Sequence, residues 1–189
     1  MKGRSRWHAA ILAFALASVL GPVAIVTANT FPNNYDHRVA DDAIHTYCLT
    51  SSYVLEEHKV VPEYAMYWLD ATTDMSDQAQ SCLSYTDVWW YKTDLPAGYR
   101  GQRTCAVVGD IPSVCDRSNV HLDFAEIDIG GLDWEDRRKT ACHELGHTIG
   151  LGEEPGTVYC MVQGDVPNAN ETYRRYSSHD ITSHINVQY

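Results

Sequence analysis

The stretch His143-Glu144-Leu145-Gly146-His147 holds two imidazoles four positions apart, with a carboxylate beside the first. Residues four apart on an α-helix share a face, so both rings can reach one metal ion. Glu144 then lies where its carboxylate can act on a water molecule at that metal. This spacing of two ligands and a base is typical of a catalytic zinc site, so the five residues predict both a helix and its chemistry.

The flanking residues predict a helix of about four turns around these five residues. Asp133 is the expected N-cap, and acidic residues follow it where free amide groups favour negative charge. Gly150 is expected to end the helix in the left-handed conformation. One side of the helix is apolar and should face the core, through Ala141, Leu145, Thr148 and Ile149.

The run from His143 to Glu153 resembles the metzincin zinc peptidases. Their pattern H-E-x-x-H-x-x-G-x-x-H matches at His143, Glu144, His147 and Gly150, and its last position is Glu153 instead of His, or of Asp in the snapalysin branch. Small secreted actinobacterial peptidases of matrixin-like or snapalysin-like type are the most similar. The resemblance covers the C-terminal third of the chain well and the middle only loosely, and residues 29 to about 80 are recognisable only by Cys48 and Cys82.

The resemblance implies an α+β fold, in which a twisted mixed β-sheet packs on helices that include an active-site helix and a C-terminal helix. It also implies a methionine turn, because Met161 stands where metzincins place the methionine beneath the metal. The thioether of Met161 is expected to be a floor for the metal and not a ligand. Gly150 is expected to turn the chain back toward the helix.

The resemblance further implies one zinc ion held by His143, His147 and Glu153. Glu144 is then the general base that takes a proton from water as the water attacks a peptide carbonyl. Zinc accepts a carboxylate oxygen as a ligand, so Glu153 suits the site chemically.

The identity of the third ligand is left undecided by the sequence, because other donors are close to Glu153 in sequence or belong to the C-terminal segment. Glu154 competes with Glu153, and His179 or His184 are more distant alternatives. Calcium sites are conceivable among the many aspartates, but none of them has the spacing of a known calcium loop.

Residues 1–28 have the features of a signal peptide. Lys2, Arg4 and Arg6 precede an apolar stretch from Ala9 to Ala28, whose last three residues fit the small-residue rule for cleavage. The protein is therefore expected to be secreted to the extracellular space. An uncleaved anchor is the alternative, since about 20 apolar residues can span a bilayer.

The charge balance argues against several partners. The formal net charge is −11, and removal of residues 1–28 takes away three basic residues and no acidic one, which gives −14. So acidic a chain is not expected to bind nucleic acid. Residues 29–189 suit a single domain, expected to be monomeric and without stable membrane association, and residues 29–40 are interpreted as a loose arm or a short pro-segment.

The cysteines indicate disulfides, because all six follow the proposed signal peptide and an even number is typical of exported chains. Neighbours along the chain are the expected partners, although many other pairings are possible: Cys48 with Cys82, Cys105 with Cys115, and Cys142 with Cys160. One alternative is that Cys48 caps the zinc in a latent form, as a cysteine does in some metzincins.

Sequence patterns elsewhere predict a helix and several strands. A helix is expected from Glu56 to about Asp70, with Pro62 in its first turn. Residues 87–91 and 104–108 have the β-branched and aromatic content of strands. Residues 120–124 alternate apolar and polar side chains, as a strand with one buried face does.

Two further interpretations concern the cleft and the C-terminus. The strand at 104–108 or the one at 120–124 is expected to pair with an extended substrate, as the cleft strand of metzincins does. His121 is expected to face solvent instead of the cleft. The stretch from Ser177 to Asp180 resembles a capping box, so Asp180 is interpreted as structural.

The sequence therefore predicts a zinc metalloendopeptidase that acts on protein or peptide substrates. A catalytically impaired, zinc-binding or binding-only member of the same fold is the alternative, because the third ligand is altered. A plain disulfide-stabilised module with a chance motif is the remaining one. Substrate specificity is not legible from the sequence.

Overall fold

A six-stranded sheet forms the base of the fold in the computed structural model, which describes residues 38–189. Its strands are β1 (Val39–Ala40), β2 (Ile44–Leu49), β3 (Ser76–Ala79), β4 (Val88–Lys92), β5 (Gly101–Val108) and β6 (Val114–Leu122). The proposed signal peptide and the first part of the segment 29–40 lie outside the described residues, whereas its end forms β1 and pairs with β6.

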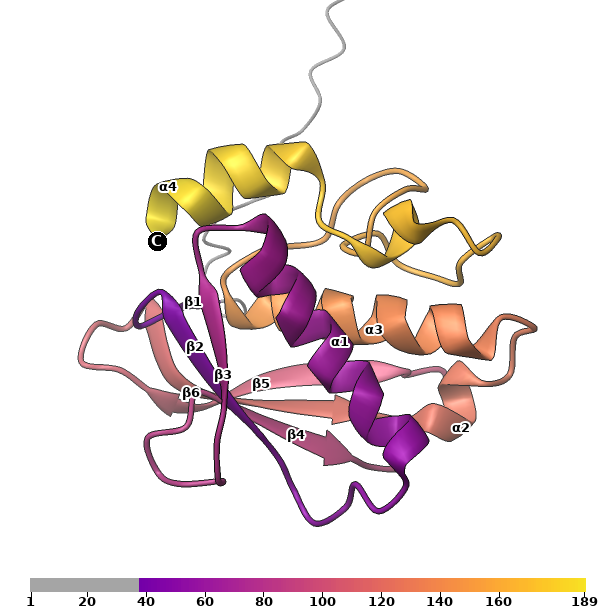
Figure 1. Ribbon diagram of the computed structural model, residues 1–189, viewed down its shortest axis with the longest axis horizontal. Helices are drawn as coiled ribbons and strands as arrows, with labels where there is room; N and C mark the ends of the chain where they lie inside the picture. Colours follow the sequence, from indigo (N-terminus) through magenta and orange to yellow (C-terminus); the bar gives the residue numbers. More distant parts are fainter. Residues whose placement is uncertain (1–37) are drawn as a thin grey trace, which may run out of the picture.

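The sheet is mixed, which agrees with the predicted α+β class. Strands β1, β2, β3, β4 and β6 pair in parallel, in the order β1-β6-β4-β2-β3, and β5 runs antiparallel to β6. Among the strands of residues 38–189, β5 pairs with β6 alone, so its outer edge is unpaired. Helices α1 (Glu56–Thr72) and α3 (Asp133–Thr148) lie across one face of the sheet (Figure 1).

Helix α1 confirms the predicted helix but not the predicted place of its proline. The helix begins at Glu56, so Pro62 lies inside it and not in its first turn. A proline there removes one helical hydrogen bond. Its ring is buried, and the neighbouring Val61 and Met66 are fully buried in the core, so packing compensates for the lost bond.

Helix α3 forms where the sequence predicts it, with one correction at its start. The helix begins at Asp133, so the N-cap is Leu132, which offers no side-chain cap. Asp133 therefore belongs to the acidic first turn, where its charge faces free amide groups. Gly150 has a φ of 97° and ends the helix as expected, and the predicted apolar side is buried.

Strand β6 confirms the predicted alternation but ends earlier than expected. Ser118, Val120 and Leu122 are buried. The strand stops at Leu122, because the Asp123 side chain accepts hydrogen bonds from Ala125 N and Glu126 N and caps the short helix α2 (Phe124–Ile127). Residues 123 and 124 are thus a helix start and not part of the strand.

The disulfides follow the predicted pairing of neighbours. Cys48 is bonded to Cys82, Cys105 to Cys115 and Cys142 to Cys160. The last bridge joins α3 to the segment that contains Met161. Because Cys48 is bonded to Cys82, it does not reach the histidines, which rules against the latent cap.

The C-terminal segment is helical and begins with the predicted capping box. Ser177 Oγ accepts a hydrogen bond from Asp180 N at 3.0 Å, and Asp180 Oδ2 accepts one from Ser177 N at 3.2 Å. After the short 3-10 helix η1 (Glu171–Arg174), the segment continues as the π-helix η2 (Asp180–Ile185) and α4 (Asn186–Gln188). Within residues 38–189, no helix is long and apolar enough to cross a bilayer.

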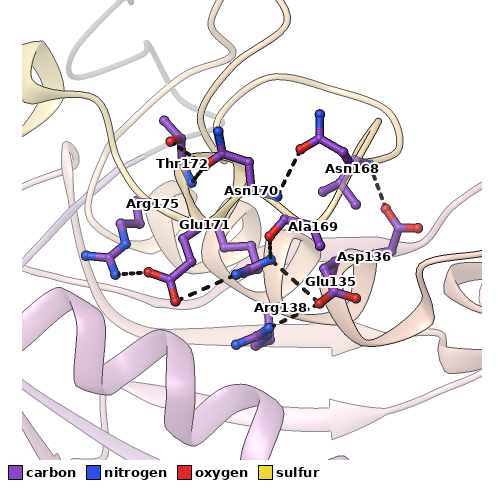
Figure 2. Close-up of polar contacts among 11 residues, drawn as sticks. Glu135, Asp136, Arg138, Asn168, Ala169, Asn170, Glu171, Thr172 and Arg175 are labelled. Atoms are coloured by element: carbon purple, nitrogen blue, oxygen red, sulfur yellow. Dashed lines mark hydrogen bonds and ion pairs between the residues drawn. The ribbon is translucent and has the colours of Figure 1, made fainter.

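A polar network holds the loop that follows Met161 against the first half of α3 (Figure 2). Glu135 pairs with Arg138 at 3.5 Å and with the buried Arg174 at 3.8 Å. Asp136 Oδ1 accepts a hydrogen bond from Val166 N at 2.7 Å. The loop therefore has a fixed position beside α3, although it contains little regular structure.

Candidate metal centre

Three donor side chains meet at the C-terminal half of α3. His143 Nε2 and His147 Nε2 are 3.1 Å apart, and Glu153 Oε1 lies 3.2 Å from the first and 3.5 Å from the second. Glu153 comes from the loop after Gly150, as the sequence predicts. Within residues 38–189, these side chains form the group of three whose donor atoms could hold one metal ion.

Backbone carbonyls orient both rings. His143 Nδ1 lies 2.8 Å from Cys160 O, and His147 Nδ1 lies 2.8 Å from Leu151 O. A carbonyl can only accept, so each Nδ1 carries the proton and each neutral ring presents the lone pair of Nε2 to the centre. Histidine ligands of metals are commonly oriented by such outer contacts.

The donors suit a divalent cation because their electron pairs face one another. Burial acts to raise the pKa of Glu153, but the adjacent rings of His143 and His147 outweigh burial and lower the pKa. Burial acts to lower the pKa of His143, but the adjacent carboxylates of Glu153 and Glu144 raise it by more. A positive charge at this point is thus favoured, and two imidazoles with one carboxylate are a known zinc ligand set.

Glu144 lies beside the centre and is 6 % exposed. Burial raises the pKa of its carboxyl group, and the neighbouring His143 and His147 oppose that shift. The side chain packs against β5: a Cβ added at Gly101 would lie 2.6 Å from Glu144 Oε1. Glycine at position 101 therefore leaves the space that the Glu144 carboxylate occupies.

The competing third donors lie elsewhere. Glu154 Oε1 accepts a hydrogen bond from Ser177 Oγ at 3.2 Å, and burial together with the negative charge of Asp180 raises the Glu154 pKa to about 7. The rings of His179 and His184 pack on each other, 4.8 Å apart. None of these three side chains joins the donor group formed by His143, His147 and Glu153.

Met161 lies against the helix that carries the histidines. It is fully buried, and a Cβ added at Gly146 would lie 2.3 Å from Met161 Sδ and 3.1 Å from a ring carbon of Tyr176. Gly146 thus permits the close contact between α3 and the segment around Met161.

Alanine at Gly146 should therefore destabilise the fold. Alanine favours a helix interior over glycine by about 1 kcal/mol, but overpacking a filled core costs about 1–3 kcal/mol, so we expect a net loss of stability. A denaturant or thermal unfolding curve measures it. Gly131→Ala is the control, because nothing lies within 4 Å of its added Cβ; equal stability of the two variants would contradict the close packing.

The donor group opens into a cleft of about 580 Å³. One wall is the start of β5 with the residues before it, and the other is the loop Val162–Asp165, while α3 lies between them. Strand β5, which contains residues 104–108, borders the cleft, but only Gly101, Gln102 and Arg103 of this strand line it. His121 is outside the cleft: its ring stacks on Tyr91 at 4.8 Å.

The residues that line the cleft without having been singled out by the sequence analysis include Arg100, Gly101, Lys139 and Asp165. The sequence could have predicted the place of Lys139 in the cleft, because it precedes His143 by one helical turn and lies on the same face of the helix. The place of Gly101 could not be predicted in this way, because it reaches the site only through the pairing of β5 with β6.

The comparisons with known proteins give a distant structural likeness. No protein-family model matches this chain, and no curated protein matches it. It is similar to the structure of myroilysin, with 18 % identity and a TM-score of 0.38 over 58 % of this chain and 48 % of that one. It is also similar to high choriolytic enzyme 1, a hatching enzyme zinc-protease from Oryzias latipes (medaka fish), with 16 % identity and a TM-score of 0.37 over 63 % of this chain and 50 % of that one. This chain thus spans about half the length of each, and at these values its function must be judged from its own side chains.

Proposed function

We propose that the protein is a secreted zinc metalloendopeptidase. The observation that carries the proposal is the convergence of His143 Nε2, His147 Nε2 and Glu153 Oε1 beside a buried glutamate in an open cleft. A ligand set of this kind with an adjacent carboxylate is the arrangement of zinc hydrolases.

His143, His147 and Glu153 would hold the zinc ion. Its chemistry when bound is that of a Lewis acid, which makes water a better nucleophile at neutral pH and offsets negative charge on a carbonyl oxygen. The two backbone carbonyls that fix the rings would keep both Nε2 atoms available to the ion.

Glu144 would carry the proton transfers of peptide hydrolysis. As the water oxygen bonds to the carbonyl carbon, a Glu144 carboxylate oxygen takes the proton that the water releases. When the carbon–nitrogen bond breaks, the same carboxyl group passes that proton to the departing amine nitrogen. Its place in the cleft suits both steps, because Glu144 directly follows the ligand His143 on α3 and lines the same cleft.

The substrate would be an extended segment of a protein or peptide. The outer edge of β5 offers backbone N–H and C=O groups that a substrate strand can pair with, and the first residues of β5 line the cleft. Secretion is supported by the three disulfides, which persist in oxidising compartments.

Metal analysis combined with peptide digestion tests the proposal. Purified protein should contain about one zinc ion per chain, cleave casein or a peptide library, lose cleavage with a chelator and regain it when zinc is added. Stoichiometric zinc without cleavage would instead favour a binding-only protein, and absence of bound zinc would contradict the metal centre itself.

A further inference from the structure

Lys139 lies in the cleft at the level of the helical turn before His143. Both residues are on the same face of α3, because they are separated by four positions. Lys139 lines the cleft although only 5 % of its surface is exposed. Its ammonium group donates a hydrogen bond to the carbonyl oxygen of Gly164 in the opposite wall.

No carboxylate in residues 38–189 forms an ion pair with Lys139. Asp136, three positions earlier on the helix, instead accepts the hydrogen bond from Val166 N. Asp165, in the same wall as Gly164, pairs with Arg100. The charge of Arg100 is therefore matched by a direct ion pair, whereas Lys139 has only the more distant charges of Asp136 and Glu153.

This arrangement leaves binding capacity at the ammonium group. An ammonium has three N–H donors, and Gly164 O accepts one of them. Burial lowers the pKa of Lys139 to about 8, which the charges of Asp136 and Glu153 only partly offset, so the group still carries a proton at neutral pH. A buried charge without a direct ion pair is costly, and a bound anion would offset part of that cost.

We propose that the cleft selects peptides with an aspartate or glutamate side chain next to the scissile bond, and that Lys139 is the residue that selects it. The inference rests on the proposed peptidase function and adds its substrate class. The carboxylate of the substrate would accept the remaining N–H donors of Lys139, while its backbone lies along β5.

The acidic groups of the cleft do not oppose this assignment. Glu153 faces two imidazoles, and Asp165 faces Arg100. Glu144, which also lines the cleft, lies beside the same two imidazoles. The whole chain carries a net charge of −11, so long-range attraction cannot explain a preference for acidic peptides. Such a preference must come from a local contact, which makes its source testable by a single substitution.

The test compares two fluorogenic peptides that differ only by glutamate or its isostere glutamine at the positions flanking the cut. We expect wild-type protein to cleave the glutamate peptide with a kcat/KM roughly 10- to 100-fold higher, the range for a hydrogen bond between charged groups. Lys139→Met, which keeps the length of the side chain, should reduce this ratio to near unity. Lys59→Met makes the same change in net charge on α1, outside the cleft, and should leave the ratio unchanged.

A binding measurement makes the result independent of catalysis. Anisotropy of the same labelled peptides on zinc-loaded Glu144→Gln protein should show the same preference, again abolished by adding Lys139→Met. Thermal unfolding checks that the variants fold. If the Lys139→Met protein does not fold, Lys139→Gln is used in its place.

The outcomes separate the two proposals. Cleavage of either peptide supports the peptidase, whatever the ratio. Equal cleavage and equal binding of the two peptides by wild-type protein, or a preference that survives Lys139→Met, overturns the role of Lys139 and means that its ammonium only fastens the loop at Gly164. If no peptide is cleaved, the proposed function fails, and the binding preference alone decides whether the pocket accepts acidic side chains.

Discussion

Replacement of Glu144 by glutamine should leave zinc bound and lower peptide hydrolysis by about 10²- to 10⁴-fold, the usual contribution of a general acid–base group. Glutamine has nearly the shape of glutamate, so it fits the space left by Gly101. It cannot accept a proton at neutral pH, and the water and the leaving amine then lack a proton carrier. The measurements are kcat on a cleaved peptide and zinc content of the same preparation.

The control is Glu63→Gln, which makes the same chemical change at an exposed position of α1. This variant should keep full activity. Substantial turnover by Glu144→Gln protein would refute the assigned base. Loss of zinc from it would mean that Glu144 serves the metal centre structurally, and the fall in kcat would then say nothing about proton transfer.

Alanine at Glu153 should lower zinc affinity on the order of 100-fold or more, since zinc binding free energies of about 10–16 kcal/mol are shared among three or four ligands. Loss of Glu153 leaves the rings of His143 and His147 in place, because backbone carbonyls hold them. The two imidazoles alone then lack the negative donor. Competition titration with a zinc-binding dye measures the change.

Glu154→Ala is the matched control, because it removes the same side chain one position later. Its carboxyl group faces Ser177 and Asp180 instead of the histidines. We expect nearly unchanged zinc affinity for this variant, although its stability can shift. If Glu154→Ala loses zinc and Glu153→Ala does not, the ligand assignment is reversed.

The parts of the fold that the sequence predicts are those with strong local patterns. Helices α1 and α3 have apolar residues at helical spacing, and strand β4 has the β-branched and aromatic content of a strand. Strand β3 is short and polar, and it forms because it pairs with β2, which no local pattern reveals. Strand β2 buries the polar His45, whose Nε2 lies 2.8 Å from Thr148 Oγ1. The order of polar and apolar residues in this strand therefore does not show which side chains are buried.

The candidate site divides in the same way. His143, Glu144 and His147 are fixed by spacing on one helix, so sequence alone suffices to bring them together. The assignment of Glu153 as a ligand depended on the family resemblance, because a loop has no residue periodicity from which its path can be predicted. The cleft wall at Gly101 depends on the register of β5 against β6, a non-local pairing that spacing along the chain does not specify.

The bridge between Cys142 and Cys160 has a consequence for how the centre assembles. Cys160 bonds to the residue before His143 through sulfur and holds the His143 ring through its carbonyl oxygen. Thiol oxidation thus preorganises an imidazole before any ion is captured, and the associated loss of conformational entropy occurs during folding. A chain with reduced cysteines would have to order that ring when the metal binds, and its affinity for the ion would be correspondingly lower.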